Sequence, residues 1–258
     1  MYTLGIDVGS TSSKAVILKN GKELVSHAVI PLGTGTVGPE QVYQQVFLNT
    51  TLSISDIAWT VATGYGRLNC SYANQQISEL SCHAKGIHFL IPDVRTIIDI
   101  GGQDAKAIRV DSNGQLINFQ MNDKCAAGTG RFLEMIARTL EVSLDELGAI
   151  ALTSTEEIEI TSMCSVFAES EVISLIANNK EKNDISNGVC NAIAGKAYGL
   201  LRRIGLEPGF MMTGGVAKNP GVVRAVEKKL GEKLYICEEP EIVGATGAAL
   251  YALEQYEG

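Results

Sequence analysis

The sequence predicts a mixed α/β protein built from two related subdomains. A strand-turn-strand pattern with an Asp-x-Gly turn occurs near residue 7 and again near residue 99. Runs of β-branched residues alternate with longer helix-like segments, which is the order of an α/β fold. Of the 258 residues, 45% are hydrophobic and 19% are charged, so the chain has enough apolar surface to bury a core.

The first copy of the repeat covers residues 5–16 and the second covers residues 98–108. Both copies place Asp, Gly, Lys and Ala at the same spacings, and each is followed by an Asn-Gly pair, at Asn20 and Asn113, which is a strong hairpin signal. Two β-hairpins can look alike by chance, but the shared Asp-x-Gly and the matching turns favour a duplication. We therefore expect an N-terminal subdomain over residues 1–94 and a C-terminal subdomain over residues 95–258.

The remaining elements follow from hydrophobic spacing and turn residues. Between the copies we expect a helix over 39–52, a strand over 57–63 and a helix over 77–89. In the second half we expect helices over 130–140, 165–177, 184–204 and 219–230, strands over 209–213 and 233–237, and a final helix over 245–255.

The composition excludes two classes of partner. Lys and Arg total 21 against 29 Asp and Glu, a formal net charge of -8, so we expect no nucleic-acid partner. No segment approaches the roughly 18 consecutive apolar residues of a membrane span, and the N-terminus lacks the pattern of a secretory signal. We expect a cytoplasmic protein with no membrane partner.

No Walker motif occurs, so phosphate binding must use another device. Residues 33–38 match G-x-G-x-x-G, but they follow a third hairpin strand rather than opening a βαβ unit, which favours a flexible loop. The Asp-x-Gly turns are better candidates, because small residues let backbone N–H groups approach an anion. The expected phosphate-binding residues are Gly9, Ser10, Thr11, Ser12, Ser13, Lys14, Gly101, Gly102 and Gln103.

The carboxylates in these turns suit magnesium and the hydrolytic water. Asp7 and Asp99 follow buried strands and can hold Mg²⁺ through water. Phosphoryl transfer depends on positioning and charge stabilisation, so Asp7, Asp99, Gln103 and Asp104 are the catalytic candidates. Which of them orients the attacking water stays open.

A third small-residue turn follows the strand at Phe210 and opens a helix. Alone, Gly214-Gly215 would be an ordinary tight turn. After two Asp-x-Gly hairpins, it is a candidate for the adenosine site, together with Val216 and Ala217. These three motifs in this order resemble those of the actin, sugar-kinase and DnaK-type ATPases. The resemblance implies an actin-like, ribonuclease H-like fold, with ATP or ADP in a cleft between two subdomains of duplicated topology; it does not by itself select an activity.

The six cysteines form no C-x-x-C pair, and a reducing cytoplasm favours free thiols or metal ligands. Cys125 and Cys164 each lie directly ahead of a predicted helix, whose N-terminus stabilises a thiolate. The other four have the pattern of small buried hydrophobic residues. They are Cys70, Cys82, Cys190 and Cys237.

From Tyr2 to about Ala252 the chain resembles the activators, or component A proteins, of the 2-hydroxyacyl-CoA dehydratases and the related benzoyl-CoA reductase subunits, ATPases of the BadF/BadG/BcrA/BcrD type. Six segments carry the resemblance: IDVGST (6–11), TGYGR (63–67), ELSCHA (79–84), DIGGQD (99–104), NDKCAAGTG (122–130) and VFAESE (166–171). The resemblance also adds Gly244 to the expected nucleotide-binding residues.

In that family two cysteines per subunit, matching Cys125 and Cys164, hold a 4Fe-4S cluster. Because such a cluster normally takes four thiolates, the resemblance implies a homodimer that shares one cluster on its two-fold axis. The neighbours in Ser162-Met163-Cys164-Ser165 depart from the small polar residues of some members, which could retune the cluster. Glu169 and Glu171 are expected to cap a helix, and His83 to be structural.

The resemblance implies an ATP-hydrolysing activator that takes a low-potential electron from a ferredoxin or flavodoxin. Its acceptor would be an iron–sulfur enzyme such as a dehydratase, a benzoyl-CoA reductase or a double-cubane cluster protein. Two alternatives stay open. One is a small-molecule kinase of the same superfamily, and the other is a non-redox nucleotide switch for protein clients, in which Cys125 and Cys164 are merely packed.

Overall fold

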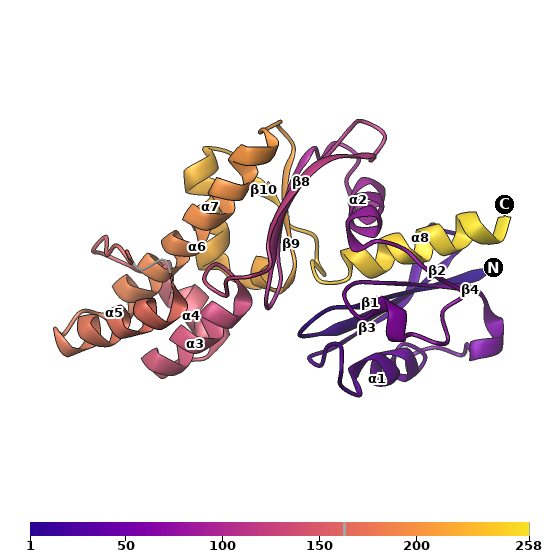
Figure 1. Ribbon diagram of the computed structural model, residues 1–258, viewed down its shortest axis with the longest axis horizontal. Coiled ribbons are helices and arrows are strands. Elements are labelled where there is room, and N and C mark those ends of the chain that lie inside the picture. Colours follow the sequence, from indigo (N-terminus) through magenta and orange to yellow (C-terminus); the bar gives the residue numbers. More distant parts are fainter. Residues whose placement is uncertain (162–163, 258) are drawn as a thin grey trace. The chain divides into compact units, whose positions relative to one another are not determined.

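The structure is a computed structural model that describes residues 1–161 and 164–257. The chain divides into two compact units (Figure 1). The first comprises Met1–Val94, Val110–Ile117 and Cys237–Gly258, and the second comprises Arg95–Arg109 and Asn118–Ile236. The first unit therefore combines the N-terminal part of the chain with residues 110–117 and the segment that begins at Cys237.

Each unit is built on a five-stranded mixed sheet. The first sheet has the order β3-β2-β1-β4-β5, formed by β1 (Tyr2–Val8), β2 (Ser13–Lys19), β3 (Glu23–Ile30), β4 (Ile57–Thr63) and β5 (Gln75–Gln76). The second has the order β10-β9-β6-β7-β8, formed by β6 (Thr96–Ile100), β7 (Ala105–Val110), β8 (Leu116–Asn122), β9 (Phe210–Thr213) and β10 (Leu234–Tyr235).

The two sheets have matching topology. In each, the central strand pairs antiparallel with the strand that follows it, β1 with β2 and β6 with β7. On its other side each central strand pairs parallel with a later strand, β4 or β9, which in turn pairs parallel with a short edge strand. The sequence repeat is therefore a repeat of the whole sheet.

Helices α1 (Gly38–Gln45), α2 (Glu79–Leu90) and α8 (Val243–Glu257) belong to the first unit. Side chains alternate between the two faces of a strand, and β2 shows it: Ala15 and Ile17 pack with Val42 of α1, whereas Val16 and Leu18 pack with Ala245 and Ala249 of α8. Both faces of this sheet are thereby buried.

Helix α8 packs in the first unit because Gly5 of β1 lets the helix backbone come close to the strand. A Cβ atom on Gly5 would collide with the backbone of Ala245 and Ala249, so only glycine allows this approach. The Thr3 hydroxyl also donates to the Ala249 carbonyl at 2.9 Å. These contacts bridge more than two hundred residues of sequence, so no local pattern predicts them.

The second unit carries five helices: α3 (Gly130–Leu140), α4 (Leu144–Ala151), α5 (Ser165–Ala177), α6 (Lys182–Ile204) and α7 (Pro220–Leu230). Predicted bounds are confirmed for α3, α5 and β4. The predicted helix over 39–52 is shorter and ends at Gln45, and α4 was not predicted. Within the described part of the chain, no helix combines the length and apolar character needed to cross a bilayer.

Candidate functional site

The first Asp-x-Gly turn joins β1 to β2 in the first unit. Strand register pairs Asp7 with Lys14, and Lys14 Nζ lies 3.8 Å from Asp7 Oδ2. Asp7 is only 5% exposed. The Gly9 N–H donates to the Ser12 carbonyl at 3.0 Å and closes the turn. A buried carboxylate beside a lysine and a tight small-residue turn is a suitable setting for phosphate and a hydrated cation.

Neighbouring loops fix the shape of this turn. Residues 31–37 form the loop that was predicted there, and Gly33 presses against the turn, since a Cβ on it would lie 2.6 Å from the Gly9 carbonyl oxygen. The Ser13 side chain is buried and its hydroxyl donates to the Leu32 carbonyl at 2.8 Å. The Ser13 hydroxyl proton is therefore used in a bond within the protein and is not available to a ligand. The neighbouring Ser10, Thr11 and Ser12 are partly exposed.

The second turn, in the second unit, repeats the first with a further carboxylate. Register pairs Asp99 with Lys106, and Lys106 Nζ lies 3.5 Å from Asp99 Oδ2 and 2.6 Å from Asp104 Oδ2. All three side chains are buried. The Thr213 hydroxyl donates to Asp99 Oδ1 at 2.9 Å. Asp104, predicted as a catalytic candidate, is thus held in a buried ion pair.

The Gly101-Gly102 turn is attached to the start of α3. The Gly101 carbonyl accepts from the Gly130 N–H and the Gly102 carbonyl from the Arg131 N–H, each at 2.9 Å. The exposed Gln103 side chain accepts through its oxygen from Nε and Nη2 of Arg131, each at 3.2 Å. Three links therefore join this turn to the helix that follows the Cys125 loop.

The third turn follows β9 as predicted. Gly214 has φ +81°, a backbone conformation that favours glycine, and a Cβ there would lie 2.9 Å from Asp99 Oδ1. Both the backbone conformation and the lack of space therefore exclude a side chain at this position. Residues Gly215–Lys218 form a 3₁₀ turn in which Val216 and Ala217 are buried. Asn219 then caps α7 by accepting from the Val222 N–H at 3.0 Å.

The structure shows one element of the repeat that the sequence analysis missed. Thr63 and Thr213 occupy equivalent register positions, beside Asp7 and Asp99. Each is followed by a glycine with positive φ, Gly64 at +85° and Gly214 at +81°. The repeated Thr-Gly after a strand was the available signal.

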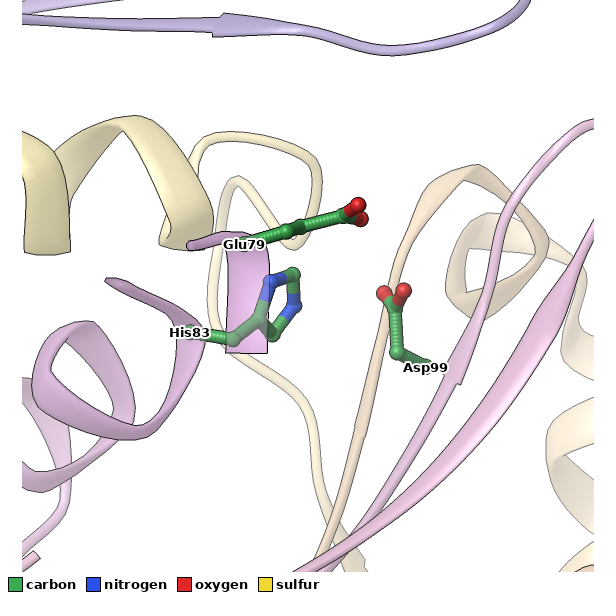
Figure 2. A group of neighbouring side chains, drawn as sticks. All are labelled: Glu79, His83 and Asp99. Atoms are coloured by element: carbon green, nitrogen blue, oxygen red, sulfur yellow. The ribbon is translucent and has the colours of Figure 1, made fainter. Parts of the chain in front are cut away.

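Helices α2 and α8 bring further polar groups to Asp7. Glu79 and His83 lie one turn apart on α2, and Figure 2 draws both side chains. His83 is buried. Gly244, in the first turn of α8, lies beside both Asp7 and His83. Gly244 was predicted as a nucleotide contact, and the structure places it behind the Asp7 carboxylate.

The two cysteines predicted as metal ligands both belong to the second unit. Cys125 is partly exposed in the loop between β8 and α3, where the Asn122 side-chain amide donates to its carbonyl at 2.9 Å. Cys164 is exposed and is the N-cap residue of α5. Ser162 and Met163, the neighbours expected to retune a cluster, lie outside the described residues. Both thiols are accessible from solvent.

The other cysteines behave differently. Burial raises the pKa of the Cys82 and Cys190 thiols to about 12, and it also raises the pKa of Cys70 and Cys237. A raised pKa disfavours the thiolate that binds metal. Cys70, Cys82 and Cys190 are buried, as predicted, whereas Cys237 is partly exposed.

The duplicated sheets, each with an Asp-x-Gly turn on its central strand, define an actin-like ATPase fold. A glucokinase of the ROK family from Streptomyces griseus shares it, with a TM-score of 0.62 over 98% of this chain and 100% of that one, at 13% identity. The chain belongs to the BadF/BadG/BcrA/BcrD ATPase family, whose model matches residues 4–252.

Two members of the family are close relatives. The activator of lactoyl-CoA dehydratase from Anaerotignum propionicum is 58% identical over 98% of each chain. The solved structure of the activator of the 2-hydroxyisocaproyl-CoA dehydratase from Clostridium difficile, with bound ADPNP, has a TM-score of 0.97 at 51% identity and covers 100% of this chain and 96% of that one.

Proposed function

We propose that the protein is an ATP-hydrolysing activator of a 2-hydroxyacyl-CoA dehydratase or a related reductase, and that it delivers a low-potential electron to that enzyme. The observation that carries the proposal is a pair of cysteines that are not buried, Cys125 in the loop ahead of α3 and Cys164 at the N-cap of α5, in an actin-like ATPase. The high identity to activators over nearly the whole chain supports it.

Each unit contributes one Asp-x-Gly turn to nucleotide binding. In the first unit, Lys14 and the N–H groups of residues 10–12 bind phosphate, and in the second the Gly101-Gly102 turn does so. Buried carboxylates, Asp7 and Asp99, supply hard oxygen ligands that fit Mg²⁺ through water. Gln103 is exposed and held by Arg131, which suits a residue that orients the attacking water.

The cysteine pair fits half of an iron–sulfur site. A 4Fe-4S cluster takes four thiolates, and Cys125 and Cys164 supply two per chain, so two chains related by a two-fold axis complete the set. Cys164 is the N-cap residue of α5, so it lies at the positive end of the helix dipole. When bound, the cluster supplies a one-electron carrier between a ferredoxin or flavodoxin and the acceptor enzyme.

A small-molecule kinase is the second candidate, since a glucokinase has the same fold. That likeness rests on 13% identity, against 58% to an activator. A kinase function also does not explain why Cys125 and Cys164, neither of which is buried, lie ahead of α3 and at the N-cap of α5. We therefore favour the activator.

The deciding experiment is iron analysis after anaerobic purification. The wild type should bind about two iron atoms per chain, and Cys125→Ala or Cys164→Ala should lose the iron together with the visible absorption. ADP affinity should persist in both variants, because nucleotide binding uses other segments. Cys237→Ala is the matched control, since Cys237 is exposed to the same intermediate extent as Cys125.

Full iron content in Cys125→Ala would contradict the ligand assignment. Cys190→Ala serves as a second control for folding, because Cys190 is fully buried in the core of the second unit. It should lower stability and leave the iron content unchanged.

A further inference from the structure

Helices α2 and α8 cross at unusually short distance in the first unit. A Cβ on Gly86 of α2 would collide with the Val243 carbonyl, and one on Gly247 of α8 would collide with the Cys82 carbonyl. The backbones are therefore in direct contact at this crossing, and only glycine permits such contact. The residues beside the crossing, Cys82 and His83, are held in fixed positions by it.

Beside Asp7, the crossing leaves a space so small that a single methyl group added there would be crowded. A Cβ on Gly244 would lie 3.2 Å from Asp7 Oδ2 and 3.3 Å from His83 Nδ1. The two polar atoms therefore line the same small space, no further apart than the sum of these two distances. Asp7 is 5% exposed and so is His83, so the imidazole and the carboxylate meet away from bulk water.

Asp7 is confined on its other sides as well. A Cβ on Gly64 would collide with Oδ1, so backbone of the residues after β4 lies against that oxygen. Lys14 Nζ approaches Oδ2 at 3.8 Å. The imidazole therefore lies in the same crowded surroundings of Oδ2 as Lys14 and Gly244.

We propose that His83 is a positioning residue for the Asp7 carboxylate, and that Gly244 is required to keep the space between them open. The proposal rests on the proposed ATPase function, in which Asp7 holds hydrated magnesium. His83 does not touch nucleotide in this scheme. It fixes the orientation of the carboxylate, and a displacement of catalytic groups by about 1 Å can cost 100-fold in rate.

A buried histidine that merely fills the core is the alternative. Removing such a residue would lower stability and would change the turnover number and the Michaelis constant only through loss of folded protein. A positioning residue behaves differently, because its loss shifts the magnesium requirement and the turnover number while phosphate contacts made by other groups maintain nucleotide affinity.

The test measures steady-state ATP hydrolysis and its dependence on magnesium concentration in His83→Ala, His83→Asn and Gly244→Ala. Asparagine can place a polar atom near the position of Nδ1, so it should retain most of the activity. His83→Ala should reduce kcat by about 10- to 100-fold and raise the half-saturating magnesium concentration, with ADP affinity within about two-fold of the wild type. Gly244→Ala should have the same signature, because its methyl group must displace Asp7 or His83.

The matched controls are His27→Ala and Gly199→Ala. His27 is exposed on β3, and a Cβ on Gly199 of α6 meets nothing within 4 Å. Wild-type kcat and magnesium dependence in folded Gly244→Ala or in folded His83→Ala, or equal losses in His83→Ala and His83→Asn, would overturn the proposal. Failure of the proposed function is distinct, because the wild type itself would then hydrolyse no ATP or bind no iron.

Discussion

At the scale of single residues, the two lysines of the repeat, Lys14 and Lys106, lie in different surroundings. Lys14 faces one carboxylate at 3.8 Å and is 13% exposed. Lys106 is 4% exposed and lies within 3.5 Å of two carboxylates, Asp99 and Asp104. A buried cation between two buried anions is needed mainly because the anions would otherwise be unpaired.

Lys106→Met should therefore destabilise the protein strongly. Removing one partner of a buried ion pair costs about 3–5 kcal/mol, and here two carboxylates lose their cation. The free energy of unfolding in urea measures the loss. Lys14→Met is the matched control and should cost clearly less.

Adding Asp104→Asn to Lys106→Met should restore part of the stability, because it removes one of the two carboxylates left without a cation. A Lys106→Met variant as stable as Lys14→Met, or a double variant no more stable than the single, would contradict this account. The repeat predicts the position of Lys106, but the pairing with Asp104 depends on the turn geometry, which residue types alone do not determine.

At the scale of elements, the long and strongly patterned helices were the predictable ones. Helices α3 and α5 have the predicted bounds, whereas α4 was missed because its eight residues carry too little periodicity. The sequence nevertheless marks the start of α4 with a capping box. The Ser143 side chain accepts from the Glu146 N–H, and the Glu146 side chain accepts from the Ser143 N–H. Helix α8 was predicted as a helix, but its place in the first unit depends on the distant Gly5.

Asp184 provides an element-scale test of a different kind. It is buried in the first turn of α6 and accepts from the N–H groups of Thr155 and Glu156, at 2.7 and 2.9 Å, and from the Ser154 hydroxyl at 3.0 Å. The Glu156 N–H bond is the largest cause that lowers the pKa of Asp184 from its ordinary value of 3.8. The carboxylate thereby ties the segment ahead of α5 to α6.

Because the pKa of Asp184 is lower in the folded protein, the hydrogen bonds of its carboxylate contribute fully to the free energy of unfolding above pH 3.8. This contribution is lost as the pH falls through the still lower pKa of the folded state. Asp184→Asn should be less stable than the wild type at neutral pH, and the difference should narrow only below about pH 4. Urea unfolding as a function of pH measures it. A difference that is already closing at pH 6 would contradict the assignment.

At the scale of the whole molecule, the second unit contains a continuous link between the turn proposed to bind phosphate, Gly101-Gly102, and both cysteine segments. The Gly101-Gly102 carbonyls hold the first turn of α3, which follows the Cys125 loop. Further along α3, the Thr139 hydroxyl lies 3.1 Å from the Met135 carbonyl of its own helix and 3.2 Å from Oε1 of Glu169 on α5, and Cys164 is the N-cap residue of α5. Nucleotide-dependent movement of the turn can therefore reach both proposed iron ligands.

Thr139→Val should weaken this coupling and leave the core intact, because valine has nearly the same shape. The rate at which a chelator removes iron should differ between the ATP-analogue and ADP states of the wild type. In Thr139→Val that difference should shrink by about 0.5–2 kcal/mol, roughly two- to 30-fold. Thr153→Val is the control, because its hydroxyl bonds only within its own helical turn. An unchanged ratio in Thr139→Val would contradict the link.

The placement of α8 has a consequence for synthesis on the ribosome. The second unit is a nearly continuous stretch that can complete its contacts as soon as it emerges. The first unit must wait, because the helix that covers one face of its sheet is translated only after the second unit. Until then the Gly5 side of β1 and the apolar side chains Val16 and Leu18 of β2 are uncovered. One apolar face of the N-terminal sheet is therefore exposed to solvent while the second unit is synthesised, and transiently exposed apolar surface of this kind favours aggregation.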